Sequence, residues 1–532
     1  MARDRLRPLA PEDDLQLPLS RKVLITLSVM LVTFMQILDT SVTNVAITHM
    51  QGSMSASVEE ITWVITSYLA ANAIVLPATG WLSGVLGRKR FFLISVTLFT
   101  VSSFLSGIAP NLTFLILARI LQGIGGGPLL PLSQAIMWEI FPLAQRGMAM
   151  AIWGVGIMFA PIIGPTLGGW ITDNWSWPWI FYINLPVGIA GFFMASAFLF
   201  DPPYLKRVQR IDALGLALMV LGFGSLQLVL DRGEREDWFD SNLIITLTVL
   251  GGAAVVLFLL RQLASDEPVV DLSVFRDRNF APGALIVAMV MFGLFSTMLL
   301  QSLYMQKLLG YDALSAGLAL APAGLGNMIS LLLAGRLVTR MDQRLLLGFG
   351  CVVNAIALSM MGHLSLSVDY WHLAVPRLIQ GLGVGFIFVP LTTLAMANIP
   401  RDRLGNATTL FNVVRNFGGS AGVALAATFL ARRSQVHQAS LVSHVNIWDP
   451  ETAHRIGELT QTFFAQGADP HTARGQALAM LYKSVVEQAT VLAFMDDFWL
   501  ITLLFIAVIF LIPLFRRVHM LPPAPSPASA GD

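Results

Sequence analysis

Fourteen stretches of mostly apolar residues are the feature that most restricts how this chain folds. Each is about 20 residues long, enough to cross a bilayer. Lipid offers no partner to unpaired backbone groups, and barrel-like alternation is missing, so each stretch predicts a helix. Only 12% of the residues are charged and 55% are hydrophobic. We therefore predict an all-α integral membrane protein with spans near 23–47, 60–82, 91–109, 112–135, 147–171, 179–200, 212–230, 242–262, 281–304, 313–335, 345–364, 371–396, 405–430 and 496–515.

Basic residues are distributed unequally between the two ends of these spans. With the N-terminus inside, most Lys and Arg fall on one side, including the run Arg88–Arg90 and the pair Arg516–Arg517. This bias predicts that both termini are cytoplasmic, with an uncleaved tail at 1–22 and a disordered one at 516–532. The formal net charge of +1 argues against nucleic acid as a partner.

A short repeat links the fourth and twelfth spans. Arg119-Ile-Leu-Gln-Gly-Ile-Gly in the fourth corresponds to Arg377-Leu-Ile-Gln-Gly-Leu-Gly in the twelfth. The chain is therefore predicted to contain two related six-helix halves with two helices inserted between them. Parallel six-helix repeats around a midplane cavity are typical of transporters. The expected parts are the tail 1–22, an N-terminal half 23–200, an inserted linker 201–280, a C-terminal half 281–515 with an outer loop 432–490, and the tail 516–532.

The fifth span carries small residues at every fourth position and two prolines. Gly and Ala at this spacing form a smooth stripe that lets another helix approach closely, and proline favours bending. One interpretation is a helix packed tightly for stability alone. The other, favoured by its place in a duplicated chain, is a gating helix whose stripe lies where the two halves meet and slide. The residues concerned are Gly156, Ala160, Pro161, Gly164, Pro165 and Gly168.

Asp39 is the one acid that the sequence places well inside a span. A carboxylate there costs several kcal/mol unless it is paired, neutralised or hydrated. Burial favours its neutral form and a nearby cation favours its charged form, so such a group is suited to carry a proton. The alternative is a structural pair or cap that holds the first span to a neighbour. Arg119, inside the fourth span, also needs a partner within the protein.

The remaining charges in or near the spans are expected to serve structure. For Arg377, whose half shows no obvious acid, we favour a role in holding backbone carbonyls or helix ends. Arg415 either lines a cavity or anchors a cytoplasmic loop. Glu139 is expected to cap or pair at the cytoplasmic interface, and Asp173 and Asp231 to lie at outer helix ends where water is available.

Several motifs together resemble the major facilitator superfamily, and within it the fourteen-helix drug:proton antiporters of the EmrB type. They are Leu38-Asp-Thr-Ser-Val-Thr-Asn, RILQGIGGGPLLPLSQ from Arg119, the Gly/Pro-rich fifth span, DNWSWPWIFYINLPVG from Asp173, GSLQLVLDRGEREDWFDS from Gly224 and VDLSVFRDRNF from Val270. The resemblance implies a major facilitator fold and proton-driven export of drugs. It further implies that Arg119 helps to load or unload a proton on Asp39, and it associates the Gly/Pro helix with antiport.

The same resemblance identifies a cytoplasmic gate loop between the second and third spans, with Gly80, Gly87, Arg88 and Lys89. Here the chain departs from the family pattern, because Gly84 and Val85 replace the usual acidic and basic residues. The interactions that hold this cytoplasmic gate loop closed are therefore expected to differ from the family pattern or to be weaker.

The absence of certain motifs from the sequence limits the possible energy sources. No GxxxxGK phosphate loop, HExxH metal motif or nucleophile elbow is present, so neither an ATPase nor a hydrolase is expected. The single cysteine, Cys351, and four histidines without tight spacing predict no metal site. We expect no cofactor and a proton gradient as the driving force.

Polar and aromatic positions on the inner helices are the candidates for a substrate cavity. With few charges in the spans, the expected cargo is a small amphipathic or aromatic compound. Most such residues in any helical protein simply pack. The candidates are Gln36, Asn44, Trp63, Tyr68, Asn72, Gln301, Tyr304, Asn412 and Arg415.

The outer loop 432–490 is too long for a simple connector, and two stretches within it have helical spacing of apolar residues. The resemblance implies that an EmrB-type protein docks to a periplasmic adaptor protein, which with an outer-membrane channel completes a tripartite pump in a Gram-negative inner membrane. Two other functions stay open: a dedicated metabolite or siderophore exporter or permease on the same scaffold, and a non-transporting receptor.

Overall fold

The computed structural model describes residues 17–201, 212–265, 268–311, 313–446 and 448–517 of the chain. Fourteen helices in these ranges are long and apolar enough to cross a membrane, which confirms the expected spans. Most of the two tails predicted at 1–22 and 516–532 lies outside the described residues. The N-terminal half contains α1 (Leu19–Met54), α2 (Val58–Val75), α3 (Thr79–Leu86), α4 (Arg88–Gly107), α5 (Leu112–Gly126), α6 (Leu129–Ile140), α7 (Leu143–Asn174), α8 (Trp179–Tyr182) and α9 (Asn184–Phe198).

Two of these spans are broken because proline interrupts the hydrogen-bond ladder. A short 3-10 turn, Leu76–Ala78, contains Pro77 and joins α2 to α3, and Pro128 separates α5 from α6. The inserted pair is α10 (Ala213–Arg232) and α11 (Asn242–Ala264). The C-terminal half contains α12 (Phe280–Leu303), α13 (Ala313–Leu337), α14 (Gln343–Met361), α15 (Tyr370–Met396), α16 (Leu404–His444), α17 (Pro450–Ala465) and α18 (Pro470–Leu511).

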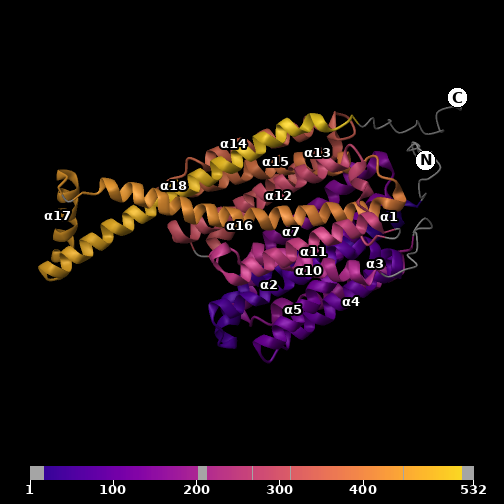
Figure 1. Cartoon of the computed structure of the whole chain (residues 1–532), viewed down its shortest axis with the longest axis horizontal. Helices are drawn as coiled ribbons and strands as arrows, with labels where there is room; N and C mark the ends of the chain where they lie inside the picture. The colour runs from indigo at the N-terminus through magenta and orange to yellow at the C-terminus, as the bar shows by residue number, and fades with distance from the viewer. Residues whose placement is uncertain (1–16, 202–211, 266–267, 312, 447, 518–532) are drawn as a thin grey trace.

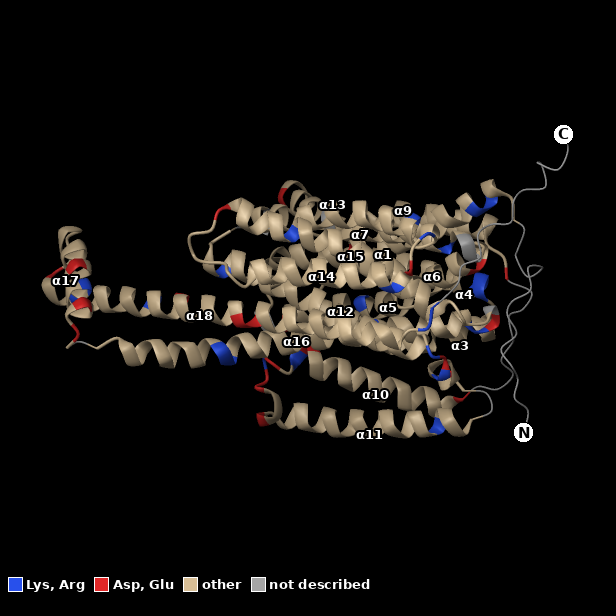
Figure 2. Ribbon diagram, turned by 90° about the horizontal axis from the view of Figure 1, so that it is seen from above, with Lys and Arg blue, Asp and Glu red and all other residues tan. Residues whose placement is uncertain are grey.

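The helices run roughly parallel in one elongated bundle (Figure 1), and the inserted pair lies along its side (Figure 2). Helix α10 contacts both halves. The hydroxyl of Thr66 on α2 donates to Asp231 over 2.5 Å, and Gln227 donates to Oγ of Ser420 on α16 over 3.1 Å. The inserted pair therefore bridges the seam between α2 and α16.

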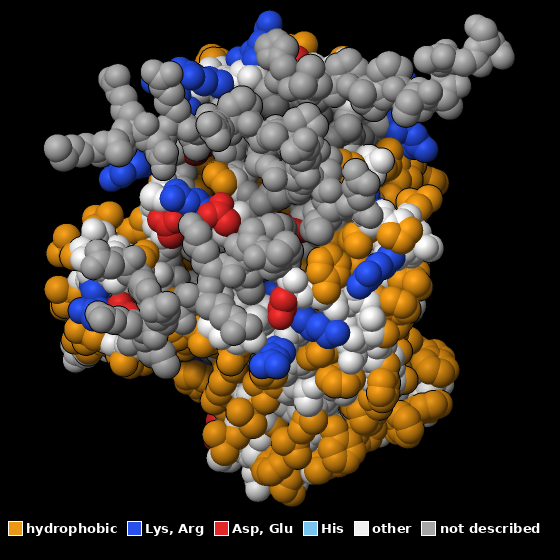
Figure 3. Space-filling model, turned by 90° about the vertical axis from the view of Figure 1, so that its right-hand side faces the viewer, with side chains coloured by type: hydrophobic (Ala, Val, Ile, Leu, Met, Phe, Trp, Pro, Cys, Tyr) orange, Lys and Arg blue, Asp and Glu red, His pale blue; other side chains and the backbone are white. Residues whose placement is uncertain are grey.

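We call the end of the bundle at which α1 begins and α18 ends the basic end. Arg88–Arg90 begin α4 here, and Arg344 donates to the carbonyl of Phe515 over 3.2 Å. Figure 3 looks onto this end and shows Lys and Arg side chains around the face, with apolar side chains covering the flanks. An apolar flank below a basic rim is what a membrane-embedded protein presents to lipid and to water.

The two halves close together toward the basic end. Every residue of α6 is buried, and so is the last part of α15. A methyl group added at Gly80 would lie 3.2 Å from Cα of Asn406, and one at Gly335 would lie 2.6 Å from Cβ of Ala151. Such spacing leaves no room between the halves at this level.

The outer loop is helical and projects from the bundle. Helices α16 and α18 are 41 and 42 residues long, continue past the bundle side by side and carry α17 at their tip (Figure 1). At the root of this hairpin, Asp496 accepts from Arg433 over 2.6 Å and from His437 over 2.7 Å. The two helical stretches expected within 432–490 are therefore confirmed as α17 and the first part of α18, and α16 and α18 continue into this segment from the bundle.

The glycine stripe of α7 packs inside the N-terminal half. Methyl groups added at Gly156 and Gly164 would collide with Met30 and Ser41 of α1, and one at Gly168 would lie 3.0 Å from Val42. The expectation that this stripe lies between the halves is therefore wrong. The face of α7 that meets the other half instead carries Ala151 and Gly154, which pack on Gly335 and Leu331 of α13, and Gly147, which packs on Val338 directly after α13.

Candidate functional site

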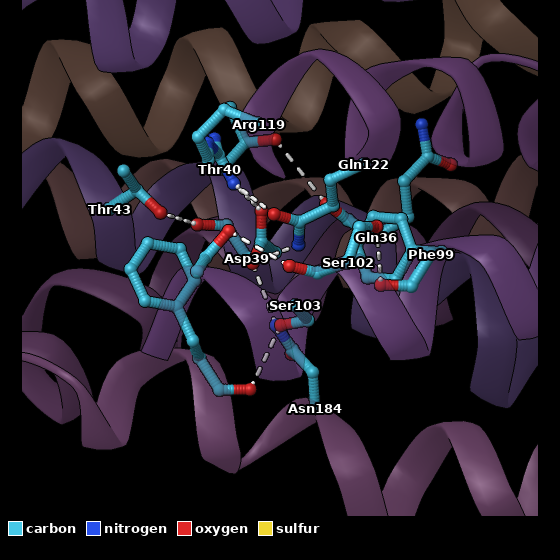
Figure 4. Close-up of polar contacts among 12 residues, drawn as sticks. Gln36, Asp39, Thr40, Thr43, Phe99, Ser102, Ser103, Arg119, Gln122 and Asn184 are labelled. Atoms are coloured by element: carbon cyan, nitrogen blue, oxygen red, sulfur yellow. Dashed lines mark hydrogen bonds and ion pairs between the residues drawn. The ribbon is translucent and has the colours of Figure 1, made fainter. Parts of the chain in front are cut away.

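Asp39 lies in the middle of α1 with only 1% of its surface exposed, at the centre of a hydrogen-bond network (Figure 4). Its Oδ2 accepts from Nη1 of Arg119 over 2.7 Å. Its Oδ1 accepts from Gln122 over 2.8 Å and from Asn184 over 2.7 Å. Three helices, α1, α5 and α9, thus meet at one carboxylate.

Arg119 is held from several sides at once. Its Nε donates to the carbonyl of Val64 over 3.2 Å, and its Nη1 also donates to Gln122 over 2.8 Å. The rings of Tyr68 and Phe181 lie 4.3 Å and 5.6 Å from the guanidinium carbon, where their faces attract a cation. The expected partnership of Asp39 and Arg119 is present in the structure as a buried ion pair.

Two members of the network did not stand out as site residues in the sequence. Gln122 was visible only as part of the repeated motif, and Asn184 as one amide in an apolar stretch. Asn184 also donates to Ser103 of α4 over 3.0 Å, and Ser103 donates to the carbonyl of Phe181 over 2.9 Å. Polar side chains in otherwise apolar spans are the signal that identifies such residues, because an unpaired amide is costly there.

This arrangement suits the charged form of Asp39. Three N–H donors, one of them from the guanidinium of Arg119, satisfy the carboxylate in its buried position. A proton that arrives must compete with Arg119, and removal of the negative charge leaves the buried guanidinium without its counter-ion. Loss of the negative charge at Asp39 would therefore weaken the bond between α1 and α5.

The repeat in the second half preserves the arginine and the glutamine without this acid. Nη1 of Arg377 donates to Oε1 of Gln380 over 2.7 Å, as Arg119 does to Gln122. Within the described ranges no carboxylate pairs with Arg377, and its Nε is buried without an acceptor. The two halves are therefore alike in backbone pattern and different in charge.

The loop at the basic end holds an ion pair although Gly84 and Val85 are uncharged. Arg88 and Glu139 form an ion pair in which both side chains are almost fully buried. The sequence predicted that Glu139 caps or pairs at this interface, and its partner is Arg88. The backbone N–H of Lys89 donates to Asp201 over 2.8 Å, and its ammonium donates to the carbonyl of Ser196 over 2.6 Å.

Two glycines allow this loop to pack. Gly87 has a φ of 84°, and a side chain there would also lie 2.9 Å from Asp201. Gly80 lies against Asn406, as described above, so the loop packs on the start of α16. The loop therefore links the ends of both halves.

The other cavity candidates are dispersed. Asn44 is exposed, whereas Gln36 and Asn72 are buried on α1 and α2. Gln301 contacts Sδ of Met361 at 3.5 Å, and the hydroxyl of Tyr304 donates to Ser365 over 2.8 Å, both inside the second half.

Three further candidates lie near the seam between the halves. Trp63 lies under the guanidinium of Arg232 of α10, at 4.0 Å. Asn412 donates to Gln134 across the halves over 2.7 Å. Arg415 is half-buried on α16, and no ion pair to it is present in the part of the chain that the structure describes.

A further acid is buried where the sequence indicated none. Asp497 on α18 has 1% of its surface exposed, as Asp39 has, and it lies beside the root of the hairpin. The sequence placed residue 497 at the outer boundary of the last span, and in the structure α18 packs on α12, α14 and α16 and buries this position.

Comparison with known proteins decides the family. The chain matches the Major Facilitator Superfamily over residues 29–423. It is 38% identical over 491 residues to the multidrug export protein EmrB of Haemophilus influenzae, covering 92% of this chain and 95% of that protein. The chain belongs to the major facilitator superfamily, and within it to the EmrB type. The resemblance seen in its motifs is thereby confirmed.

Other matches agree on the fold. The fatty acid resistance protein FarB of Neisseria gonorrhoeae is 35% identical, over 91% of this chain and 94% of that protein. The crystal structure of the human organic anion transporter MFSD10 superposes with a TM-score of 0.61 at 14% identity, covering 93% of this chain and all of that one. As a superfamily member the chain is a multi-pass membrane transporter.

Proposed function

We propose that this protein is a proton-coupled exporter of amphipathic compounds. The observation that carries the proposal is the ion pair of Asp39 and Arg119, buried at the junction of three helices of the first half. A titratable acid in this position is costly for stability alone and is typical of proton-driven transport.

The basic end is proposed to face the cytoplasm, in agreement with the positive-inside bias. The closed seam between the halves then lies on the cytoplasmic side and the hairpin on the periplasmic side of a Gram-negative inner membrane. Because the halves are closed on the proposed cytoplasmic side, the conformation is outward-facing in this orientation. The closed seam is supported by the hydrogen bond of Asn412 to Gln134 and by the close contact of Gly335 with Ala151.

In this conformation a proton from the periplasm binds Asp39 and displaces Arg119 from it. The loss of this bond allows α1 and α5 to separate and the halves to rock, so that the cavity opens inward. The proton then leaves to the cytoplasm and Arg119 pairs with Asp39 again. Each proton supplies about 2.3 kcal/mol per 100 mV and about 1.4 kcal/mol per pH unit, and no cofactor is needed.

The proposed cargo is taken from the names of the relatives and from the apolar character of the spans. EmrB is named for multidrug export and FarB for fatty acid resistance. An amphipathic compound with an apolar body is consistent with both of these names. We further propose that the hairpin of α16, α17 and α18 binds a periplasmic adaptor protein, which with an outer-membrane channel would complete a tripartite pump.

The test uses everted inner-membrane vesicles with an imposed pH gradient. Accumulation of ethidium and of a fluorescent long-chain fatty acid is compared for wild type, Asp39→Asn and Asp173→Asn. Asp173 is the control because it is an exposed acid near the end of α7, 3.6 Å from His49. We expect Asp39→Asn to lose gradient-driven accumulation and Asp173→Asn to keep it.

Other outcomes distinguish the alternatives. Gradient-driven transport by Asp39→Asn at the wild-type rate would overturn the role of Asp39. Accumulation by intact cells without accumulation by everted vesicles would indicate an uptake permease on the same scaffold. Absence of transport of any probe by wild type would favour a receptor.

A further inference from the structure

Asp497 is a buried acid that the exchange at Asp39 does not use. It lies on α18 with 1% of its surface exposed, and its Oδ2 is buried without a hydrogen-bond partner. Among the described residues, no cation pairs with it. Asp39 has equal burial and accepts three hydrogen bonds, so the two acids have opposite surroundings.

Such surroundings suit only the neutral form of a carboxyl group. An ionised carboxylate with a buried oxygen that accepts no hydrogen bond costs several kcal/mol, whereas a protonated one buries only a small polar group. The surroundings of Asp497 therefore favour its neutral form in this conformation.

The charged groups around Asp497 add to the difference between its surroundings and those of Asp39. Asp496, the preceding residue, binds Arg433 at 2.5 Å and His437 at 2.7 Å on α16, so these two groups are already engaged. On the other elements against α18, Tyr304 packs on Phe494 and donates its hydroxyl to Ser365.

His363, which follows α14, packs on Trp499 and contacts the carbonyl of Ser359 at 2.7 Å. None of these groups provides a positive charge for Asp497. The negative charge of Asp496 disfavours a second ionised acid beside it.

The position of Asp497 links it to moving parts. Helix α18 is the sixth span of the second half and packs on α12, α14 and α16. Its counterpart in the first half, α9, supplies Asn184 to Asp39. The Asp496 cluster next to it is about one third exposed, at the root of the hairpin, so water reaches the immediate neighbour of Asp497.

We propose that Asp497 is a second proton-binding residue of the transport cycle, whose protonation stabilises the conformation described here. A proton from the hairpin side binds the carboxylate of Asp497 and allows α18 to pack on the second half. Loss of that proton leaves an unpaired charge and opens this packing. Through Asp497, acid on the hairpin side therefore favours this conformation and alkali disfavours it, opposite in direction to the effect of protonating Asp39. The inference rests on the proposed proton-coupled function.

The first experiment needs no cargo. Infrared spectra of the purified protein are recorded during a pH titration, for wild type, Asp497→Asn and Asp496→Asn. A protonated carboxyl band present in wild type at neutral pH should be absent in Asp497→Asn and retained in Asp496→Asn. A band that persists unchanged in Asp497→Asn would overturn the inference.

The second experiment follows the conformation with paired spin labels on α12 and α18. The wild-type distance distribution should change as pH rises, and Asp497→Asn, which cannot ionise, should keep the acid distribution throughout. Asp497→Glu restores an acid and should restore the pH dependence. Equal pH profiles for wild type and Asp497→Asn would contradict the inference even if vesicles transport normally. Failure of the proposed function shows separately, as wild-type vesicles that move no probe.

Discussion

Nδ2 of Asn412 lies 2.7 Å from Oε1 of Gln134, and this hydrogen bond joins α16 of one half to α6 of the other. Both side chains are completely buried. The bond has to break whenever the basic end opens, so it contributes to the balance between the two conformations of the transporter.

Asn412→Ala is therefore expected to shift the protein toward opening at the basic end. A buried hydrogen bond contributes about 1 kcal/mol, which is about fivefold in the ratio of the two states. Distances between spin labels on α6 and α16 measure that ratio. Asn354→Ala is the control, because Asn354 is also buried and donates to the carbonyl four residues earlier, as Asn412 does, but within its own half. Equal shifts in both variants would contradict the prediction.

Arg119→Lys should reduce gradient-driven transport by about tenfold or more. A lysine ammonium is a single point, and it cannot bind Asp39, Gln122 and the carbonyl of Val64 in the geometry of the guanidinium. Arg377→Lys is the matched control from the repeat, where only the contact to Gln380 is lost, and we expect about a twofold effect or less. Vesicle transport assays check both variants, and similar losses would refute a special role for the first half.

Gly164→Leu is expected to destabilise the N-terminal half by about 2 kcal/mol or more, because the new side chain collides with Ser41 and pushes α7 away from α1. A Cβ added at Gly169, five positions along the same helix, meets nothing within 4 Å, so Gly169→Leu should be tolerated. Thermal unfolding of the detergent-purified variants, followed by a thiol-independent fluorescence signal, measures the difference. Comparable melting temperatures for the two variants would show that the stripe does not pack as described.

The surroundings of Asp342 at the basic end lead us to expect that the stability of the folded protein depends on pH. Burial raises its pKa, but the N–H and guanidinium of Arg344 and the charge of Arg517 outweigh burial and lower the pKa below its usual value. A lowered pKa in the folded state stabilises the protein above the pKa of the unfolded chain, and this contribution is lost as pH falls through the folded-state pKa.

Asp342→Asn should therefore lower the melting temperature at neutral pH and approach wild type in acid, below about pH 4. Thermal unfolding at a series of pH values measures both curves. A constant difference between them across the series would exclude the ionic contribution of Asp342.

The sequence by itself determined the fold class and the pair at the centre of the site. Fourteen apolar segments in a chain that must satisfy its backbone inside lipid leave only helices, and the repeat around Arg119 and Arg377 implies two halves. The energetic cost of a charge inside a span predicted that Asp39 and Arg119 need partners, and each is the partner of the other. These inferences rest on constraints that act on each segment alone.

Only the tertiary structure decided which helix faces which. The small residues of α7 would allow close packing on either α1 or α13. The spacing of the glycines does not distinguish these two neighbours, because periodicity defines a face of a helix and not the helix that packs on it. Likewise, Gln122 and Asn184 join Asp39 from separate helices, and Asp497 is buried because α18 packs on α12, α14 and α16. Burial of a side chain depends on what packs around it, and that is a property of the assembled helices rather than of any one of them.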